Sequence, residues 1–161
     1  HFGLTPNVPY ACQTKENPIL LPATKGKYFN VVGMMTRKNK FYFEVLETTF
    51  NSDRIICFMD RFVEQTVKKT VVILDNSPIH KSKKIMAKIE QWKEKDVLIY
   101  FLPPYSPELN LIEILWRRIK YKWLDFDAYR SFQNLKESLN FVLNSFGTKY
   151  DIKFWPLLIK K

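Results

Sequence analysis

The sequence has few of the residues that build disulfide frameworks, zinc sites or covalent catalytic centres. Only two cysteines and two histidines occur among its 161 residues. Cys12 and Cys57 have no metal-ligand spacing, so the pattern argues against a zinc site and predicts reduced, buried thiols. No Ser/His/Asp or Cys/His arrangement is evident, which argues against a nucleophilic side chain.

Long apolar runs and targeting segments are also lacking. No stretch has the length and apolar character of a membrane-spanning helix, and the first residues do not resemble a signal peptide. We find no internal repeat and no low-complexity segment. The apolar fraction of 46% excludes a disordered chain, and the length suits one domain, residues 1–161, with a substantial core. We therefore expect no membrane partner.

Acidic residues are outnumbered by basic ones. The chain has 26 Lys and Arg against 16 Asp and Glu, a formal net charge of +10. Such an excess favours a polyanionic partner such as a nucleic acid. The signal is weak alone, because ribosomal and membrane-surface proteins share it.

An acid follows a strongly apolar run near the middle of the chain. Residues 70–74 are almost all β-branched or aliphatic, which is typical of a parallel strand buried on both faces, and Asp75 follows directly. Ser77-Pro78 has the pattern of a helix start, predicting a helix over residues 78–92. Residues 97–102 predict a second buried strand. Ligands in such sheets bind beyond the carboxyl ends of the strands, where Asp75 is expected.

A second acid is expected on the helix that follows Pro104. Its apolar positions recur at spacings of three and four: Ile112, Leu115, Trp116, Ile119 and Trp123. Glu113 lies about 100° round the helix from Ile112, at the margin of the apolar stripe. A carboxylate at this position can face the end of a neighbouring strand while the helix stays packed.

Each acid also has a structural explanation. Asp75 fits the first position of an Asx turn. Glu113 stands three residues after Asn110 and four before Arg117, so it fits a capping box or a helical ion pair. Only the two acids together, on a strand–helix–strand–helix pattern, favour metal binding.

The remaining pattern predicts a mixed α/β domain. Strands are expected at residues 10–13, 28–35 and 40–50. Helices are expected at residues 53–68, capped by Asn51-Ser52, and at residues 131–146, with Gly147 as the final helix stop. None of the other acids is expected to bind metal: Glu44 and Glu47 are expected to be solvated charges, Asp53 to interact with the helix dipole, and Asp60 to lie at the surface. The apolar tail after Asp151 is expected to pack on the core or to contact a second subunit.

Two blocks of the sequence resemble the signature blocks of DDE transposases, in the bacterial insertion-sequence branch of the mariner superfamily. They are LDNSPIHKS, residues 74–82, and FLPPYSPELNLIEILWRRIK, residues 101–120. The resemblance covers most of the chain, including residues 1–13 and 146–150. It implies an α/β fold of the ribonuclease-H-like type, a mixed sheet with helices on both faces, here without its first strand.

The resemblance also implies the catalytic residues. Asp75 matches the second family acid, and Glu113, rather than Glu108, matches the third. Both would bind Mg²⁺ or Mn²⁺, as a pair of ions. The first family acid lies just before the block that matches residues 1–4, and no Asp occurs before Asp53. We therefore expect an N-terminally truncated catalytic domain that is inactive alone and lacks the family's helix-turn-helix region.

Two departures from the family pattern are minor. The separation of Asp75 and Glu113 is slightly longer than the commonest family spacing. Leu111 stands where many relatives have Pro.

In such a family the reaction is DNA cleavage at transposon ends followed by strand transfer into target DNA. The expected partners are DNA and a second copy of the chain, without a small-molecule substrate, in the bacterial cytoplasm at the nucleoid. Candidate DNA contacts are Lys81, Lys83, Arg117 and Lys120. His80 could orient a phosphate or water, or be a hydrogen-bonded structural histidine.

Two alternative functions stay open from the sequence. One is an inactive transposase remnant that only binds DNA or protein. The other is a ribonuclease-H-like nuclease that cuts without joining. The sequence does not reveal the transposon-end sequence or the target preference.

Overall fold

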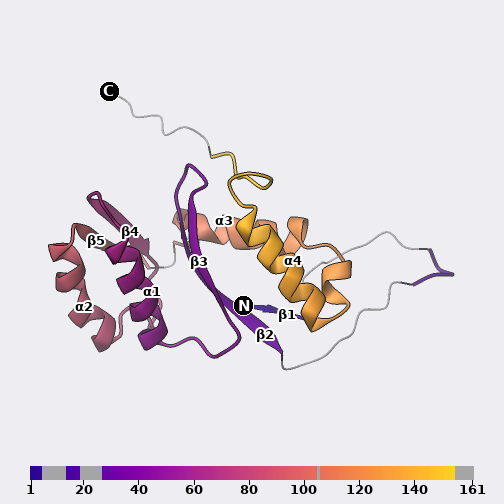
Figure 1. The fold of residues 1–161 in the computed structure, drawn as a ribbon, viewed down its shortest axis with the longest axis horizontal. Helices are drawn as coiled ribbons and strands as arrows, with labels where there is room; N and C mark the ends of the chain where they lie inside the picture. The colour runs from indigo at the N-terminus through magenta and orange to yellow at the C-terminus, as the bar shows by residue number, and fades with distance from the viewer. Residues whose placement is uncertain (5–13, 19–26, 105, 155–161) are drawn as a thin grey trace.

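The computed structural model describes residues 1–4, 14–18, 27–104 and 106–154 (Figure 1). The main elements in these ranges, in chain order, are β1 (Phe2–Gly3), β2 (Tyr28–Met35), β3 (Phe41–Leu46), α1 (Ser52–Glu64), β4 (Thr70–Leu74), α2 (Lys83–Glu94), β5 (Val97–Phe101), α3 (Leu111–Arg118) and α4 (Phe132–Asn144). A π-helical turn, Ile119–Trp123, extends α3, and short 3₁₀ turns occupy Pro107–Leu109 and Asp127–Tyr129. The predicted strand at residues 10–13 lies outside the described residues.

The described strands form an antiparallel and a parallel sheet. β1, β2 and β3 are antiparallel neighbours, with Phe2 opposite Phe29, whereas β4 and β5 pair in parallel from Thr70 opposite Val97. The mixed α/β class is as predicted. The two-residue β1, Phe2–Gly3, is a strand that the sequence pattern did not predict.

The antiparallel sheet separates two hydrophobic cores. On one face, Val31, Phe41 and Phe43 pack on a core that includes Leu115 and Ile119 of the α3 region and four residues of α4. On the other face, Tyr42 packs against Phe58 and Phe62 of α1. The second core joins α1, α2, β4 and β5. In Figure 1, these four elements group at one end, and α4 lies beyond β2 and β3. Helices thus cover both faces of this sheet.

The prediction that β4 is buried on both faces is wrong. Val72 is buried, but Val71 and Ile73 are 58% and 53% exposed. Tyr100 of β5 is also exposed. Strand residues alternate between faces, and α1 and α2 cover only the face that carries Val72. An unbroken apolar run therefore does not prove burial on both faces.

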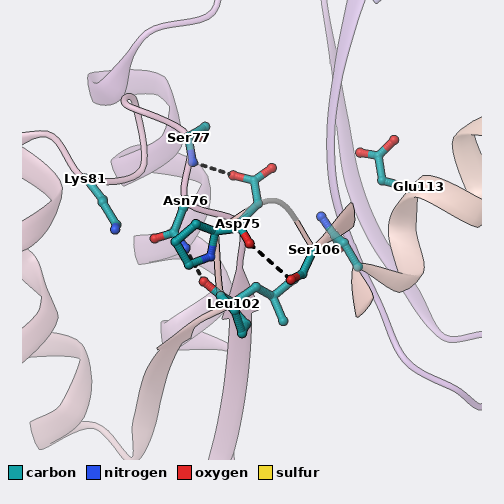
Figure 2. A pocket seen from close by; sticks show the side chains of 10 residues that line it. Asp75, Asn76, Ser77, Lys81, Leu102, Ser106 and Glu113 are labelled. Carbon is teal, nitrogen blue, oxygen red and sulfur yellow. Dashed lines mark hydrogen bonds between the residues drawn. The ribbon is translucent and has the colours of Figure 1, made fainter. Parts of the chain in front are cut away.

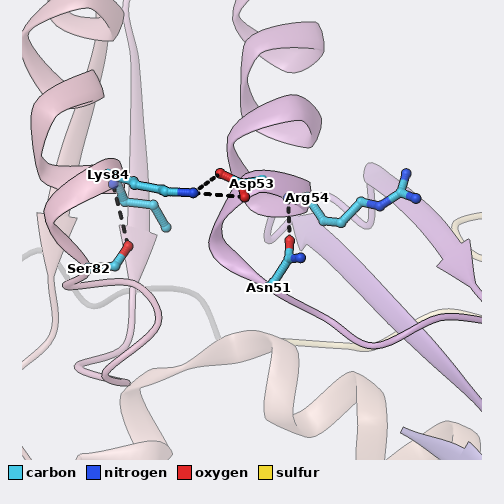
Figure 3. Close-up of polar contacts among 6 residues, drawn as sticks. Asn51, Asp53, Arg54, Ser82 and Lys84 are labelled. Atoms are coloured by element: carbon cyan, nitrogen blue, oxygen red, sulfur yellow. Dashed lines mark hydrogen bonds and ion pairs between the residues drawn. The ribbon is translucent and has the colours of Figure 1, made fainter.

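The predicted start of α2 is also wrong. The helix begins at Lys83 rather than Pro78, and its N-cap is Ser82, whose Oγ accepts from the Ile85 N–H at 3.4 Å (Figure 3). The Ser77 N–H instead donates to Asp75, and residues 78–82 form turns. Ser77 is part of a turn rather than a helix because the Asp75 carboxylate accepts a hydrogen bond from its backbone N–H.

α1 is capped as predicted and is tied to α2 by charge. Asn51 Oδ1 accepts from the Arg54 N–H at 3.0 Å, and Asp53 pairs with Lys84 at 2.8 Å (Figure 3). Asp53 lies in the first turn of α1, as predicted, and also forms this largely exposed ion pair between the two helices.

Several predicted details differ from the structure. β3 ends at Leu46 and α1 at Glu64, each four residues before the predicted end. Cys57 is exposed on α1, so the prediction of a buried thiol is wrong for this residue. The apolar stripe of α1 instead places Phe58 and Met59 inside. Cys12 lies outside the described residues.

Candidate functional site

Asp75 directly follows the carboxyl end of β4. Its Oδ1 accepts from the Ser77 N–H at 3.0 Å and lies 2.8 Å from His80 Nδ1. Burial alone raises the pKa of Asp75, but the hydrogen bonds from Ser77 and the neighbouring His80 outweigh burial and hold this pKa below its ordinary value. The predicted Asx turn is thus present, and it uses only one carboxylate oxygen. Within the described ranges, Oδ2 has no hydrogen-bond partner.

Glu113 lies in the first turn of α3, with an exposed side chain. Neither structural explanation offered by the sequence is realised. Asn110 is the N-cap but makes no side-chain capping bond. Among the ion pairs of the described residues, none joins Glu113 to Arg117. The Glu113 carboxylate is therefore left available to a ligand.

The two acids line the same pocket, with a volume of about 550 Å³. In Figure 2, Asp75 lies to one side of Ser106, and Glu113 lies to the other side. The Asn76 side-chain amide donates to the Leu102 carbonyl, which ties the ends of β4 and β5 together. The structure therefore brings together two acids that the sequence separates by a strand, a helix and a loop.

Oxygen atoms dominate the polar lining of this pocket. Besides both carboxylates, the lining includes Asn76, Ser106 and Asn110, and Asn76 Oδ1 is buried without a partner among the described residues. Carboxylate and amide oxygens are the ligands of Mg²⁺ and Mn²⁺, and Mg²⁺ commonly takes one or two carboxylates plus substrate phosphates. The residues present fit a divalent ion in this respect. No group of three or more His, Cys, Asp or Glu side chains suited to a metal occurs within the described parts of the chain.

The four cations predicted as DNA contacts lie at different places relative to the two acids. Lys81 lines the acid pocket (Figure 2). Arg117 and Lys120 line a second pocket of about 400 Å³ that shares Glu113 with the first. Lys83 lines neither pocket.

The sequence reasoning did not single out Asn76, Ser106, Asn110 or the second pocket. Asn76 could have been found, because it is adjacent to Asp75 in the Asp-Asn-Ser-Pro turn. Ser106 and Asn110 precede α3 in an irregular segment whose path the residue pattern does not determine.

The other acids considered in the sequence have structural roles. Glu44 pairs with Arg61, and Glu47 pairs with Lys136 at 2.5 Å. Asp60 accepts from the buried indole of Trp92 and pairs with Lys88. Each of these carboxylates thus pairs with a side chain from a distant part of the sequence.

The start of the chain also lies near the site. Lys120, which lines the second pocket together with Glu113, has its Nζ 5.4 Å from the centre of the Phe2 ring. β1 therefore lies beside the pocket that includes one of the two acids.

Comparisons with known proteins identify a similar fold and the family. A crystal structure of the Mos1 strand transfer complex contains a similar fold, with a TM-score of 0.57, 16% sequence identity and coverage of 90% of this chain. The chain spans only 45% of that relative. No curated protein matches the chain, and none of the helices in the described ranges is long and apolar enough to cross a membrane. The family model of the DDE superfamily endonucleases matches residues 1–136, so the chain belongs to this family.

Proposed function

We propose that this chain is the catalytic domain of a transposase that cleaves DNA at transposon ends and joins it to target DNA. The observation that carries the proposal is the convergence of Asp75 and Glu113 on one pocket at the carboxyl end of β4. The membership of the DDE endonuclease family supports a phosphodiester substrate.

Asp75 and Glu113 would each supply oxygen ligands to Mg²⁺ or Mn²⁺. Asp75 Oδ1 is fixed by Ser77 and His80, so the second oxygen is left to face the pocket. Glu113 approaches from α3, a different element, so the two carboxylates can hold ligands between them. A pair of divalent ions bound there would stabilise the attacking and leaving oxygens of an in-line displacement at phosphorus.

The surroundings of the acids support DNA as the substrate. Lys81 lies in the acid pocket, and Arg117 and Lys120 lie just beyond Glu113. Cations so placed can neutralise the phosphates of a polyanion, in accord with the net charge of +10. Lys83 lines neither pocket, and the proposal gives it no phosphate contact. The proposal places the protein at bacterial DNA in the cytoplasm, acting with a second copy of itself and without a small-molecule substrate.

A third acid is part of the proposal. The family resemblance puts it just before the block that matches residues 1–4, and Phe2 in that block lies against Lys120, which lines a pocket with Glu113. A polypeptide extended at this end could therefore bring a third carboxylate to the same pocket.

The test has a binding arm and a reaction arm. Mn²⁺ binding to the 161-residue chain is measured by titration calorimetry for the wild type, Asp75→Asn, Glu113→Gln and the control Glu108→Gln. DNA cleavage and strand transfer are measured with the same substitutions in a chain extended upstream through the proposed third acid. We expect loss of Mn²⁺ binding and cleavage for Asp75→Asn and Glu113→Gln, and near-normal behaviour for Glu108→Gln.

The outcomes separate the alternatives. Normal cleavage by Glu113→Gln would refute the assignment of the acid. Cleavage without joining would favour a ribonuclease-H-like nuclease. DNA binding without Mn²⁺ binding or cleavage in any form of the chain would favour an inactive remnant.

A further inference from the structure

The two acids lie between two cationic ends. The pocket that holds Asp75 and Glu113 includes Lys81, on the opposite side of Asp75 from Glu113 (Figure 2). The second pocket, which shares Glu113, includes Arg117 and Lys120 beside one further acid, Glu108. A ligand that crosses both pockets would therefore meet positive charge, then the two carboxylates, then positive charge again.

Each cationic end has a lysine placed over a phenylalanine ring. Lys81 Nζ lies 5.7 Å from the centre of the Phe101 ring, and Lys120 Nζ lies 5.4 Å from the centre of the Phe2 ring. An ammonium group at this distance is attracted by the negative face of the ring. The two rings belong to β5 and β1, which pair with β4 and β2. Each ring thus favours a position of its ammonium group beside the acids before any ligand arrives.

These two lysines differ from their neighbours along the chain. Lys84 and Lys88 are occupied by Asp53 and Asp60. In the part of the chain that the structure describes, neither Lys81 nor Lys120 forms an ion pair with a carboxylate. A cation that is held in place without a neutralising carboxylate is suited to bind an anion from outside.

We propose that Lys81 and Lys120 bind backbone phosphates on opposite sides of the cleaved phosphodiester, and that Phe101 and Phe2 are the positioning residues that hold the two ammonium groups. The proposal rests on the proposed function, because it takes a DNA strand as the ligand. The proposal assigns phosphate contacts to Lys81 and Lys120 but not to Lys83. It also implies that the DNA strand passes across Glu113. Holding a flexible lysine in place beforehand lowers the entropy lost on binding.

The test measures DNA binding without divalent metal, so cleavage plays no part. The affinity of the 161-residue chain for a fluorescein-labelled DNA duplex is followed by anisotropy over a series of salt concentrations. Lys81→Gln and Lys120→Gln should each reduce the slope of log K against log salt by about 0.9, the value for one phosphate. The matched controls Lys83→Gln and Lys122→Gln should leave the slope unchanged.

The phenylalanines are tested by coupling. Phe101→Leu should weaken binding about two- to fivefold while the salt slope stays the same, since no charge is removed. In the Lys81→Gln background, Phe101→Leu should have no further effect. Phe2→Leu and Lys120→Gln should behave in the same way. A merely structural role of either ring would weaken binding equally in both backgrounds.

Lys81→Arg and Lys120→Arg test the same contacts while the rings stay intact. Arginine keeps both the charge and the contact with the ring, so these variants should keep the slope. Salt-dependent binding with equal slopes for Lys81→Gln and Lys83→Gln would overturn this inference alone. Binding that does not respond to salt at all would also remove DNA as the partner under the proposed function.

Discussion

Trp92 Nε1 of α2 donates a hydrogen bond of 2.7 Å to Asp60 Oδ1 of α1. The indole is 2% exposed, so its N–H has no access to water. Asp60→Ala leaves this donor buried without an acceptor, which should cost about 1–3 kcal/mol of unfolding free energy. Urea unfolding checks the value. In the Trp92→Phe background, Asp60→Ala should cost much less, and an equal cost in both backgrounds would contradict the explanation.

The same contact predicts a dependence of stability on pH. Burial raises the pKa of Asp60, but hydrogen bonds from Trp92 and Lys88 outweigh burial and lower it. Ionised Asp60 therefore stabilises the fold fully above the ordinary pKa of aspartate, about 3.9, and this stabilisation is lost as the pH falls through the lower folded-state pKa. Asp60→Asn keeps an acceptor for Trp92 but removes the charge. The stability difference between wild type and Asp60→Asn should shrink on acidification, as measured by urea unfolding across pH.

His80 is predicted to act through Asp75. Its Nδ1 lies 2.8 Å from Asp75 Oδ1. His80→Ala should raise the pKa of Asp75 toward its ordinary value, which carbon NMR of the carboxyl group measures. Removal of such an orienting partner should weaken Mn²⁺ binding about 10- to 100-fold. His80→Gln, which retains a donor, should restore part of the binding. An unchanged Asp75 titration in His80→Ala would contradict this role.

Gly147 is predicted to be irreplaceable. It follows α4 at a φ of +86°, and a Cβ there would lie 2.5 Å from the Asn39 carbonyl oxygen. Asn39 in turn exchanges two hydrogen bonds of 3.2 Å with the backbone of Ile152. Gly147→Ala should destabilise the protein by more than about 1 kcal/mol, through backbone strain and the clash. Thermal unfolding should show a far smaller effect for Gly3→Ala, where the nearest atom is 3.4 Å from the added Cβ.

Two isoleucines test the finding that α1 and α2 cover only one face of β4. Ile85 of α2 is 0% exposed, whereas Ile73 of β4 is 53% exposed. Ile85→Ala should cost about 2–5 kcal/mol, because it removes apolar contacts and leaves a cavity. Ile73→Ala should cost far less in the same urea unfolding experiment. Similar losses at both positions would mean that the outer face of β4 is covered in solution.

The sequence predicted best where local chemistry determines the structure. β2 and β4 have the predicted bounds, and Asn51 caps α1 as expected. The candidate site was found because Asp75 ends an apolar strand and Glu113 follows a proline-rich loop. The topology led to the hypothesis that the two acids lie close together, and both line one pocket in the structure.

The sequence failed where two local patterns competed or where distant residues decide. Residues 75–78 fit both an Asx turn at Asp75 and a helix start at Ser77-Pro78. The turn forms, because the Asp75 carboxylate accepts a hydrogen bond from the Ser77 N–H, and the helix begins after Ser82. The exposure of Val71 and Ile73 depends on which elements cover β4, and the composition of the strand does not contain this information. The pairing of Lys81 with Phe101 joins residues from different elements. No spacing rule would reveal it.

The two acids are anchored in different cores. Asp75 follows β4, which packs with α1 and α2, while Glu113 belongs to α3, which packs with α4. The separation of the carboxylates is therefore set by how the two halves sit against the antiparallel sheet between them. Substitutions deep in either half, such as at Ile85 or Leu139, can shift one acid relative to the other by a fraction of an ångström. Under the proposed function, selectivity for ions of different radius could thus evolve at positions remote from the pocket.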